Sequence, residues 1–215
     1  MNIATRLTEI KKILPDNVVL VAVSKTKPVQ DLMAAYNAGQ RIFGENKIQE
    51  MTDKFEEMPK DIQWHMIGHV QRNKVKYMAP FVALVHGVDS LKLLQEINKQ
   101  AEKNNRIISV LLQVFIADEE TKFGFDKNEI SEIFNSDFKN DYKNVKIEGL
   151  MGMATFTDKQ EQIKEEFTTL KNLYDQFATA NDLTVLSMGM SGDYKIAIDC
   201  GSTMVRIGSS IFGSR

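Results

Sequence analysis

The chain has 215 residues, enough for one domain or two small ones, and its 43% apolar residues can form a sizeable core. A net charge of -2 excludes the strong overall field that favours nucleic acids or anionic membranes. One cysteine, Cys200, excludes an internal disulfide framework and favours a reducing compartment. Neither a signal-peptide core nor an apolar run of the roughly 20 residues that span a bilayer is present. We therefore expect a cytoplasmic globular protein.

Apolar runs alternate with amphipathic stretches, which predicts strands alternating with helices. In chain order the predicted elements are strand 18–23, helix 28–38, strand 41–43, helix 47–58, strand 62–67, helix 73–78, strand 81–88, helix 90–104, strand 107–116, helix 127–134, strand 145–151, helix 159–180, strand 184–188, helix 193–198 and strand 203–207. In the helix 90–104, the residues expected on one apolar face are Leu91, Leu94, Ile97 and Ala101.

Strict alternation of strands with helices predicts a parallel sheet, and the apolar character of the strands indicates that both faces are covered. Eight such units in 215 residues fit a compact (β/α)8 barrel of the TIM type, with residues 1–215 as one domain. An open doubly wound sheet is the alternative, because periodicity alone does not separate the two folds.

Binding sites in both folds lie at the carboxyl ends of the strands, so the polar residues that follow each apolar run are the candidates. Lys25 follows the first run, where an amine directed into the barrel mouth can form a Schiff base. A solvated lysine in the loop is the alternative. Asn46 follows the second run, and it can face the same mouth, cap the helix that starts at Lys47, or do both.

One histidine lies in the third run and another follows it, but the glycine between His65 and His69 argues against a helical metal pair. The His-Glu-x-x-His pattern of zinc enzymes is also absent. We expect lining or structural roles for these histidines and for His86, and we predict no metal site.

Residues 186–193 and 205–210 each pair glycine with serine at a strand end, where N–H groups and hydroxyls can bind an anion. In barrels the loops after the last two strands are a frequent phosphate site, although ordinary turns and caps use the same residues. Arg206 is a cation within an apolar run and needs a partner, either a ligand heteroatom or a carboxylate such as Asp199. An amine, a phosphate cradle and an arginine at one mouth suit pyridoxal 5′-phosphate (PLP).

The sequence resembles the PLP homeostasis proteins of the YggS/PROSC type, which are related to the N-terminal barrel of alanine racemase. The similar segments are residues 21–25, 43–46, 64–68, 186–193 and 205–213, of which Ser-Met-Gly-Met-Ser-x-Asp and Arg-Ile-Gly-Ser are the specific motifs. One departure is visible, since the family's Pro-Leu-Gln-x-Asn-Lys stands here as the segment 69–74, which begins with His69 and Val70. We expect this loop to differ in conformation.

The resemblance implies a fold type III PLP-binding barrel without the C-terminal β-domain of alanine racemase. It implies that Lys25 forms the Schiff base and that Arg206 faces the pyridine nitrogen. It also implies that Ser191 holds the phosphate together with the amides of Gly208 and Ser209. Asn46 is expected beside the ring hydroxyl.

Two function classes compete, a racemase and a PLP carrier. In alanine racemases a tyrosine of the C-terminal β-domain supplies the second base, and here the chain ends at Arg215, directly after the last barrel motif. The tyrosines of this chain fall in predicted helices or loops: Tyr36, Tyr77, Tyr142, Tyr174 and Tyr194. A cation opposite the ring nitrogen also weakens the ring as an electron sink. We expect a monomeric, non-catalytic protein of vitamin B6 (PLP) homeostasis that passes PLP to apoenzymes, with neither nucleic acid nor membrane as a partner.

Overall fold

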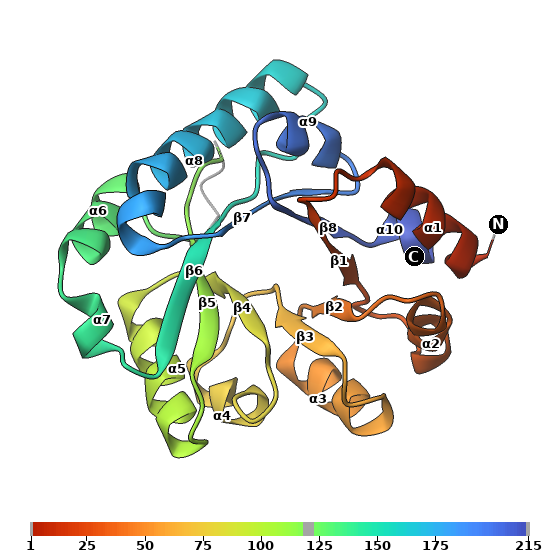
Figure 1. The fold of residues 1–215 in the computed structure, drawn as a ribbon, viewed down its shortest axis with the longest axis horizontal. Helices are drawn as coiled ribbons and strands as arrows, with labels where there is room; N and C mark the ends of the chain where they lie inside the picture. The colour runs from red at the N-terminus through yellow and green to blue at the C-terminus, as the bar shows by residue number, and fades with distance from the viewer. Residues whose placement is uncertain (1, 118–122, 214–215) are drawn as a thin grey trace.

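The computed structural model describes residues 2–117 and 123–213. Eight parallel strands form a closed barrel in the order β1 to β8, with the helices outside it (Figure 1). The barrel closes because β1 pairs with β2 on one side and with β8 on the other. The predicted (β/α)8 barrel of the TIM type is thus confirmed, and the open doubly wound sheet is excluded.

The strands lie close to their predicted positions. They are β1 (Val19–Val23), β2 (Ile42–Glu45), β3 (Gln63–Met66), β4 (Leu84–Val88), β5 (Ile108–Gln113), β6 (Val145–Met151), β7 (Val185–Met190) and β8 (Met204–Ile207). The predicted strand 81–88 begins later as β4, because the amides of Phe81 and Val82 donate to the carbonyl of Met78 and form a turn.

The predicted helices are also found, with ends that differ by a few residues. They are α2 (Val29–Asn37), α3 (Ile48–Glu57), η1 (Arg72–Lys74) with α4 (Val75–Met78), α5 (Leu91–Lys103), α6 (Lys127–Asn135), α8 (Gln160–Asn181) and α9 (Tyr194–Asp199). The predicted face of α5 is wrong at Leu91, which is 48% exposed, whereas Leu93 is buried. Leu91 is the first helical residue after the Ser90 cap, and the buried stripe starts later.

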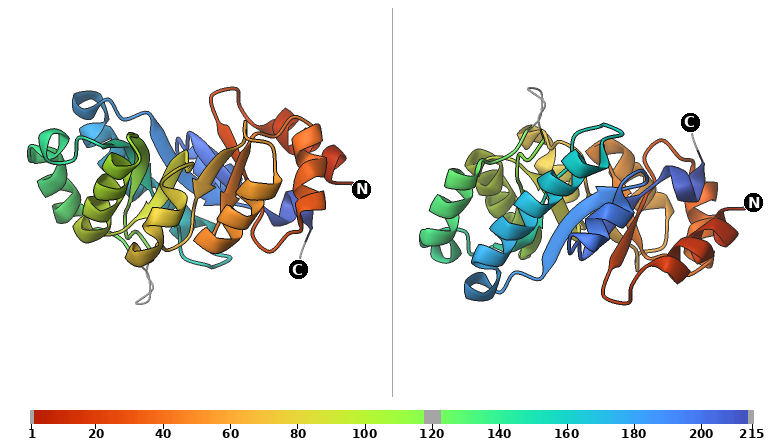
Figure 2. Two further views of the ribbon diagram at one scale, coloured as in Figure 1. Left: turned by 90° about the horizontal axis from the view of Figure 1, so that it is seen from below. Right: turned by 90° about the horizontal axis from the view of Figure 1, so that it is seen from above.

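Three helices have no counterpart among the predicted elements: α1 (Ile3–Ile13), α7 (Phe138–Asp141) and α10 (Ser209–Phe212). The last two have four residues each, too few for a periodic pattern to be read. Helix α1 buries Leu7 and Ile10 and lies beside α10, so that the two ends of the described chain are neighbours (Figures 1 and 2). Arg6 Nε donates to Ile211 O at 2.7 Å and ties the two helices together.

Most buried apolar side chains lie between the strands and the surrounding helices. The barrel interior holds a smaller apolar cluster: Val21, Leu84, Leu111, Met151 and Met204. Because side chains alternate along a strand, the interior residues lie two apart, as Val21 and Val23 do on β1. Towards the carboxyl ends of the strands the buried interior becomes polar, which marks that end for function. Among the described residues, no helix has the length and apolar character needed to cross a membrane.

Candidate functional site

A cavity of about 430 Å³ opens at the carboxyl ends of the strands, with walls from the segments that follow β1, β2, β3, β6, β7 and β8. Every binding residue expected from the resemblance lines it: Lys25, Asn46, Ser191, Arg206, Gly208 and Ser209. Its volume falls within the range of small-ligand sites. The structure thus brings together residues that lie at opposite ends of the sequence.

Lys25 follows β1 and lines the cavity. It lies two residues beyond Val23, in the turn that follows the strand, and both residues line the cavity. The lysine is half-buried, and in residues 2–117 and 123–213 its amine has no hydrogen bond or ion pair. An amine in this setting is available to a ligand.

Arg206 on β8 is 4% exposed. Its Nη1 donates to Ser187 O at 2.9 Å and to Ser187 Oγ at 2.6 Å, and its Nη2 donates to Gly152 O at 3.0 Å. Of the two alternatives for its partner, the Asp199 carboxylate is wrong, because Asp199 is exposed at the end of α9. Burial lowers the pKa of Arg206 to about 10, so the side chain remains a cation at neutral pH. A guanidinium has five N–H donors, and the described contacts leave two of them for a ligand.

A buried hydrogen-bonded chain continues from Arg206 across the barrel interior. Ser187 Oγ lies 3.0 Å from His86 Nδ1, and His86 Nε2 lies 3.0 Å from His65 Nδ1. Burial lowers the pKa of His65 to about 3 and that of His86 well below its usual value, so both rings are neutral. One set of proton positions is consistent with these three contacts: Arg206 donates to Ser187, Ser187 donates to His86, and His86 donates to His65.

The two buried histidines are therefore structural, as expected from the sequence. His69 is exposed instead, with Nδ1 3.0 Å from Asp89 Oδ2 and its ring stacked on Phe123 at 4.7 Å between centroids. These contacts hold the loop in which the family's usual proline is replaced. Within the described ranges, no group of three or more His, Cys, Asp or Glu residues is placed to hold a metal ion.

The two glycine–serine segments meet on one wall of the cavity. The N–H of Gly208 donates to Ser191 Oγ at 3.2 Å. A Cβ at Gly208 would lie 3.0 Å from Val23 O, which is closer than side chains usually approach, whereas a Cβ at Gly192 would have no described atom within 4 Å. The first N–H groups of a helix lack partners within it, and Ser209 begins α10 at the same wall. Together these groups form a neutral cradle of hydroxyls and amides that suits an anion.

Asn46 lies on the cavity wall, and the alternative role of helix cap is wrong. Lys47 is the N-cap of α3, the helix begins at Ile48, and no side chain caps it. The backbone of Gly68 packs against Asn46 so closely that a Cβ would lie 2.5 Å from Asn46 O. The backbones of Gly68 and Asn46 are therefore in direct contact, and a larger residue at position 68 would force one of them to move.

Sequence reasoning missed two kinds of residue. Met153 and Phe156, which follow β6, line the cavity but are apolar, so a search for polar residues after strands passes over them. Ser187 within β7 and Gly152 directly after β6 accept hydrogen bonds from Arg206. Ser187 lies in the same glycine–serine segment as Ser191, four residues earlier, and strand alternation was the signal that could have placed it inside the barrel.

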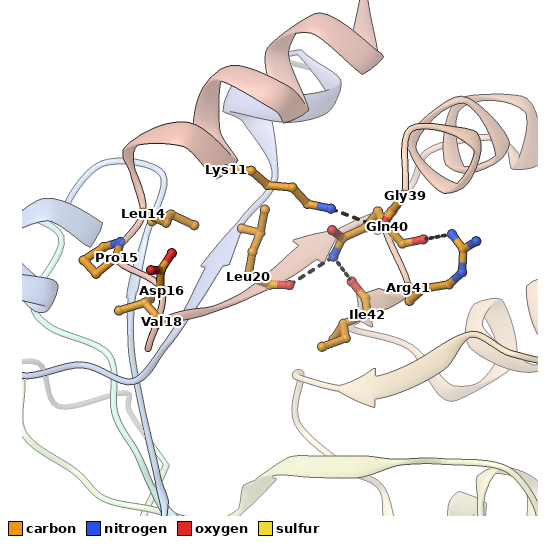
Figure 3. Close-up of a pocket in the computed structure, with 10 residues that line it drawn as sticks. All are labelled: Lys11, Leu14, Pro15, Asp16, Val18, Leu20, Gly39, Gln40, Arg41 and Ile42. Carbon is orange, nitrogen blue, oxygen red and sulfur yellow. Dashed lines mark hydrogen bonds between the residues drawn. The ribbon is translucent and has the colours of Figure 1, made fainter.

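A second cavity of about 330 Å³ lies at the amino ends of β1 and β2, beneath α1 (Figure 3). Lys11 Nζ donates to Gly39 O at 3.1 Å, and Gln40 Nε2 donates to Leu20 O at 3.0 Å and Ile42 O at 2.7 Å. The donors of Lys11 and Gln40 are thus used by backbone carbonyls, which leaves these two side chains little for a ligand.

Comparison with known proteins identifies the family. Residues 1–215 match the family model described as alanine racemase, N-terminal domain. The pyridoxal phosphate homeostasis protein of Aquifex aeolicus is 39% identical over 199 residues, which are 91% of this chain and 86% of that protein. The chain belongs to the family of pyridoxal phosphate homeostasis proteins.

Solved structures agree with this assignment. PipY of Synechococcus elongatus without PLP covers 99% of this chain and 100% of its own, with a TM-score of 0.93 and 32% identity. The same protein with PLP bound gives a TM-score of 0.88 and 31% identity, over 99% of this chain and 100% of its own. An alanine racemase of Clostridium difficile has a TM-score of 0.81 at 14% identity, which shows the shared fold; the match covers 100% of this chain and 57% of that one.

Proposed function

We propose that this protein binds PLP at the carboxyl end of the barrel and holds it as a Schiff base with Lys25. The observation that carries the proposal is one cavity in which a lysine amine that has no partner among the described residues shares the walls with a hydroxyl-and-amide cradle and a buried guanidinium. PLP offers an aldehyde, which condenses with a primary amine with loss of water. Its phosphate suits the cradle of Ser191, Gly208 and Ser209.

Relatives support this assignment. The relatives in Aquifex aeolicus and Schizosaccharomyces pombe are named pyridoxal phosphate homeostasis proteins, and PipY has been solved with PLP bound. The open space at Gly192 also leaves room for a phosphate beside Ser191. We assign Arg206 to the pyridine nitrogen and Asn46 to the ring hydroxyl, with residues 1–215 acting as one PLP-binding domain.

We further propose that the protein holds PLP rather than catalyses a reaction with it. Arg206 remains a cation at neutral pH, and a cation beside the ring nitrogen disfavours its protonation, which weakens the ring as an electron sink. None of the described residues that line the cavity is a tyrosine that could serve as a second base. The proposed role is a monomeric, cytoplasmic PLP reservoir in vitamin B6 homeostasis that delivers PLP to apoenzymes.

The experiment compares two lysines that line the same cavity. Lys25→Ala is expected to abolish the absorbance of the Schiff base on PLP titration while retaining weaker, reversible binding through the phosphate cradle. Lys27, whose amine donates to Phe212 O at 3.3 Å, gives the matched control, and Lys27→Ala is expected to keep the absorbance. An unchanged spectrum in Lys25→Ala would refute the assignment.

A racemase assay tests the carrier role separately. Purified protein loaded with PLP is expected to racemise L-alanine no faster than free PLP does. A rate well above that of free PLP would contradict the carrier role and favour a PLP-dependent amino-acid racemase.

A further inference from the structure

A cluster of charged side chains adjoins the backbone beside Lys25. Lys54 on α3 is 5% exposed, and its ammonium donates to Ser24 O at 2.9 Å, Glu45 Oε1 at 2.7 Å and Glu50 Oε1 at 2.8 Å. An ammonium has three N–H donors, so these acceptors use all of them. The cluster joins the ends of β1 and β2 to α3.

The residue after Lys25 has a strained backbone that the same cluster holds. Thr26 has a φ of 64°, in the left-handed region that β-branched residues rarely adopt. Its N–H donates to Glu50 Oε1 at 2.6 Å. Strained conformations persist only where surrounding contacts impose them, and they gather at functional sites. The carbonyl before Lys25 and the amide after it are thus both held by this cluster.

Glu45 completes the cluster from the side of the barrel. Its side chain is fully buried, and Oε1 accepts from Ser24 Oγ at 2.6 Å as well as from Lys54. Burial raises the pKa of this carboxyl, while Lys54 and Ser24 oppose the rise. Oε2 has no hydrogen-bond partner among the described residues, so Lys54 is the group that compensates the buried carboxylate.

We propose that Glu50 and Lys54 are positioning residues that hold the strained turn at Thr26 so that the Lys25 side chain enters the cavity. The inference rests on the proposed function, because it concerns the geometry of the amine that receives PLP. Neither residue lines the cavity in the described structure, so both act through the backbone of Lys25. Small misplacements of a reacting group slow a reaction strongly, which makes the effect measurable.

The test uses Glu50→Ala, which removes the acceptor of the Thr26 amide. Glu57→Ala is the matched control, because it removes an exposed carboxylate from the same helix. Glu50→Gln is the conservative variant, since its amide oxygen can still accept from Thr26. The double variant Glu50→Ala/Thr26→Gly supplies a rescue, because glycine adopts a positive φ without steric strain and does not need Glu50 to hold it there.

Two probes separate the amine from the phosphate cradle. PLP reports the rate at which Lys25 forms the C=N bond, and pyridoxine 5′-phosphate, which lacks the aldehyde, reports reversible binding alone. We expect Glu50→Ala to slow the PLP reaction at least about tenfold and to leave the affinity for pyridoxine 5′-phosphate within about twofold. Glu50→Gln and Glu57→Ala are expected to react at nearly the rate of the unmodified protein.

The rescue decides between positioning and a merely structural role. When Thr26 is already glycine, adding Glu50→Ala is expected to slow the PLP reaction by less than about threefold. An unchanged PLP rate in Glu50→Ala would overturn the inference, as would an equal loss for both probes. The melting temperature of each apoprotein shows whether the variant folds, and Glu50→Gln keeps the test available if Glu50→Ala does not. Failure of the unmodified protein to link PLP to Lys25 would instead reject the proposed function.

Discussion

The two ends of the barrel carry cavities of similar size but opposite chemistry. At the amino end, Lys11 and Gln40 donate to backbone carbonyls, and Arg41 donates to Asp61 and to two carbonyls. At the carboxyl end, Lys25 has no partner within the described chain, and Arg206 keeps donors to spare. The nitrogen donors of the two cavities therefore differ in whether partners among the described residues already use them.

The largest expected difference between the two ends concerns anion binding. Ser191→Asp places a carboxylate in the cradle and is expected to weaken PLP binding about 100-fold, because it repels the phosphate in a partly desolvated cavity. Lys11→Glu reverses a charge at the amino end and is expected to change the affinity by less than about twofold. Titration with PLP measures both. An equal loss in Lys11→Glu would show that the two ends do not act independently.

The second largest expected difference concerns how much the buried hydrogen bonds at each end contribute to the free energy of unfolding. Ser187→Ala removes the hydroxyl between Arg206 and His86 and is expected to lower the free energy of unfolding by about 2–3 kcal/mol, because it leaves a charged donor and a ring nitrogen unsatisfied. Gln40→Ala removes two hydrogen bonds that a neutral amide donates to carbonyls, and it is expected to lower the free energy of unfolding by about 1 kcal/mol. Urea denaturation of the apoproteins gives these values. Only Ser187→Ala is expected to weaken PLP binding as well, because Ser187 binds Arg206. Equal affinities for PLP in both variants would contradict the assignment of Arg206 to the PLP ring.

The smallest expected effect concerns pH. The pKa values of His65 and His86 are lowered in the folded protein, so the unfolded chain binds more protons below about pH 6.5 and the folded state loses stability as the pH falls. From pH 7.5 to pH 5.5 we expect a loss of about 1 kcal/mol for each histidine. Urea denaturation of the double variant His65→Gln/His86→Gln is expected to show a flatter dependence.

The exposed histidine provides the control for that measurement. His69→Gln is the matched variant, because it changes a histidine that lies outside the buried pair and is about half exposed. The raised pKa of Glu45 acts in the opposite direction, since it favours the folded state as the pH falls. That contribution is common to all the variants and cancels in the comparison. A double variant with an unchanged slope would show that the buried pair does not govern the acid sensitivity.

Much of the carboxyl end was predictable from the sequence, because strand order in a parallel barrel brings the strand ends to one mouth. Lys25 and Asn46 were placed by this rule, and Arg206 was noticed as a cation within an apolar run. Residues 145–151 were predicted with the observed bounds, since the apolar run has clear limits. The predicted cap at Asn46 failed because the helix begins at Ile48, one residue later than predicted, and Lys47 takes the N-cap position; a local pattern does not fix a helix end to one residue.

The hydrogen bonds around Arg206 and Lys54 were not predictable, because they join residues that are far apart in the sequence. Ser187 and His86 are 101 positions apart in the sequence, and their contact arises only when the barrel closes. The cluster around Lys54 combines a helix residue with two strand ends, whereas the sequence shows only an ordinary charged residue on an amphipathic helix. Such contacts depend on tertiary packing, which periodicity does not describe.

The most direct test of the central claim is a borohydride-trapped peptide map. Apoprotein is incubated with PLP, reduced with borohydride and digested, and the labelled peptides are identified by mass spectrometry. The account predicts about one label per chain on the peptide that contains Lys25, with Lys27 and Lys11 unlabelled. A label on Lys27 or Lys11, or none on any lysine, would contradict it.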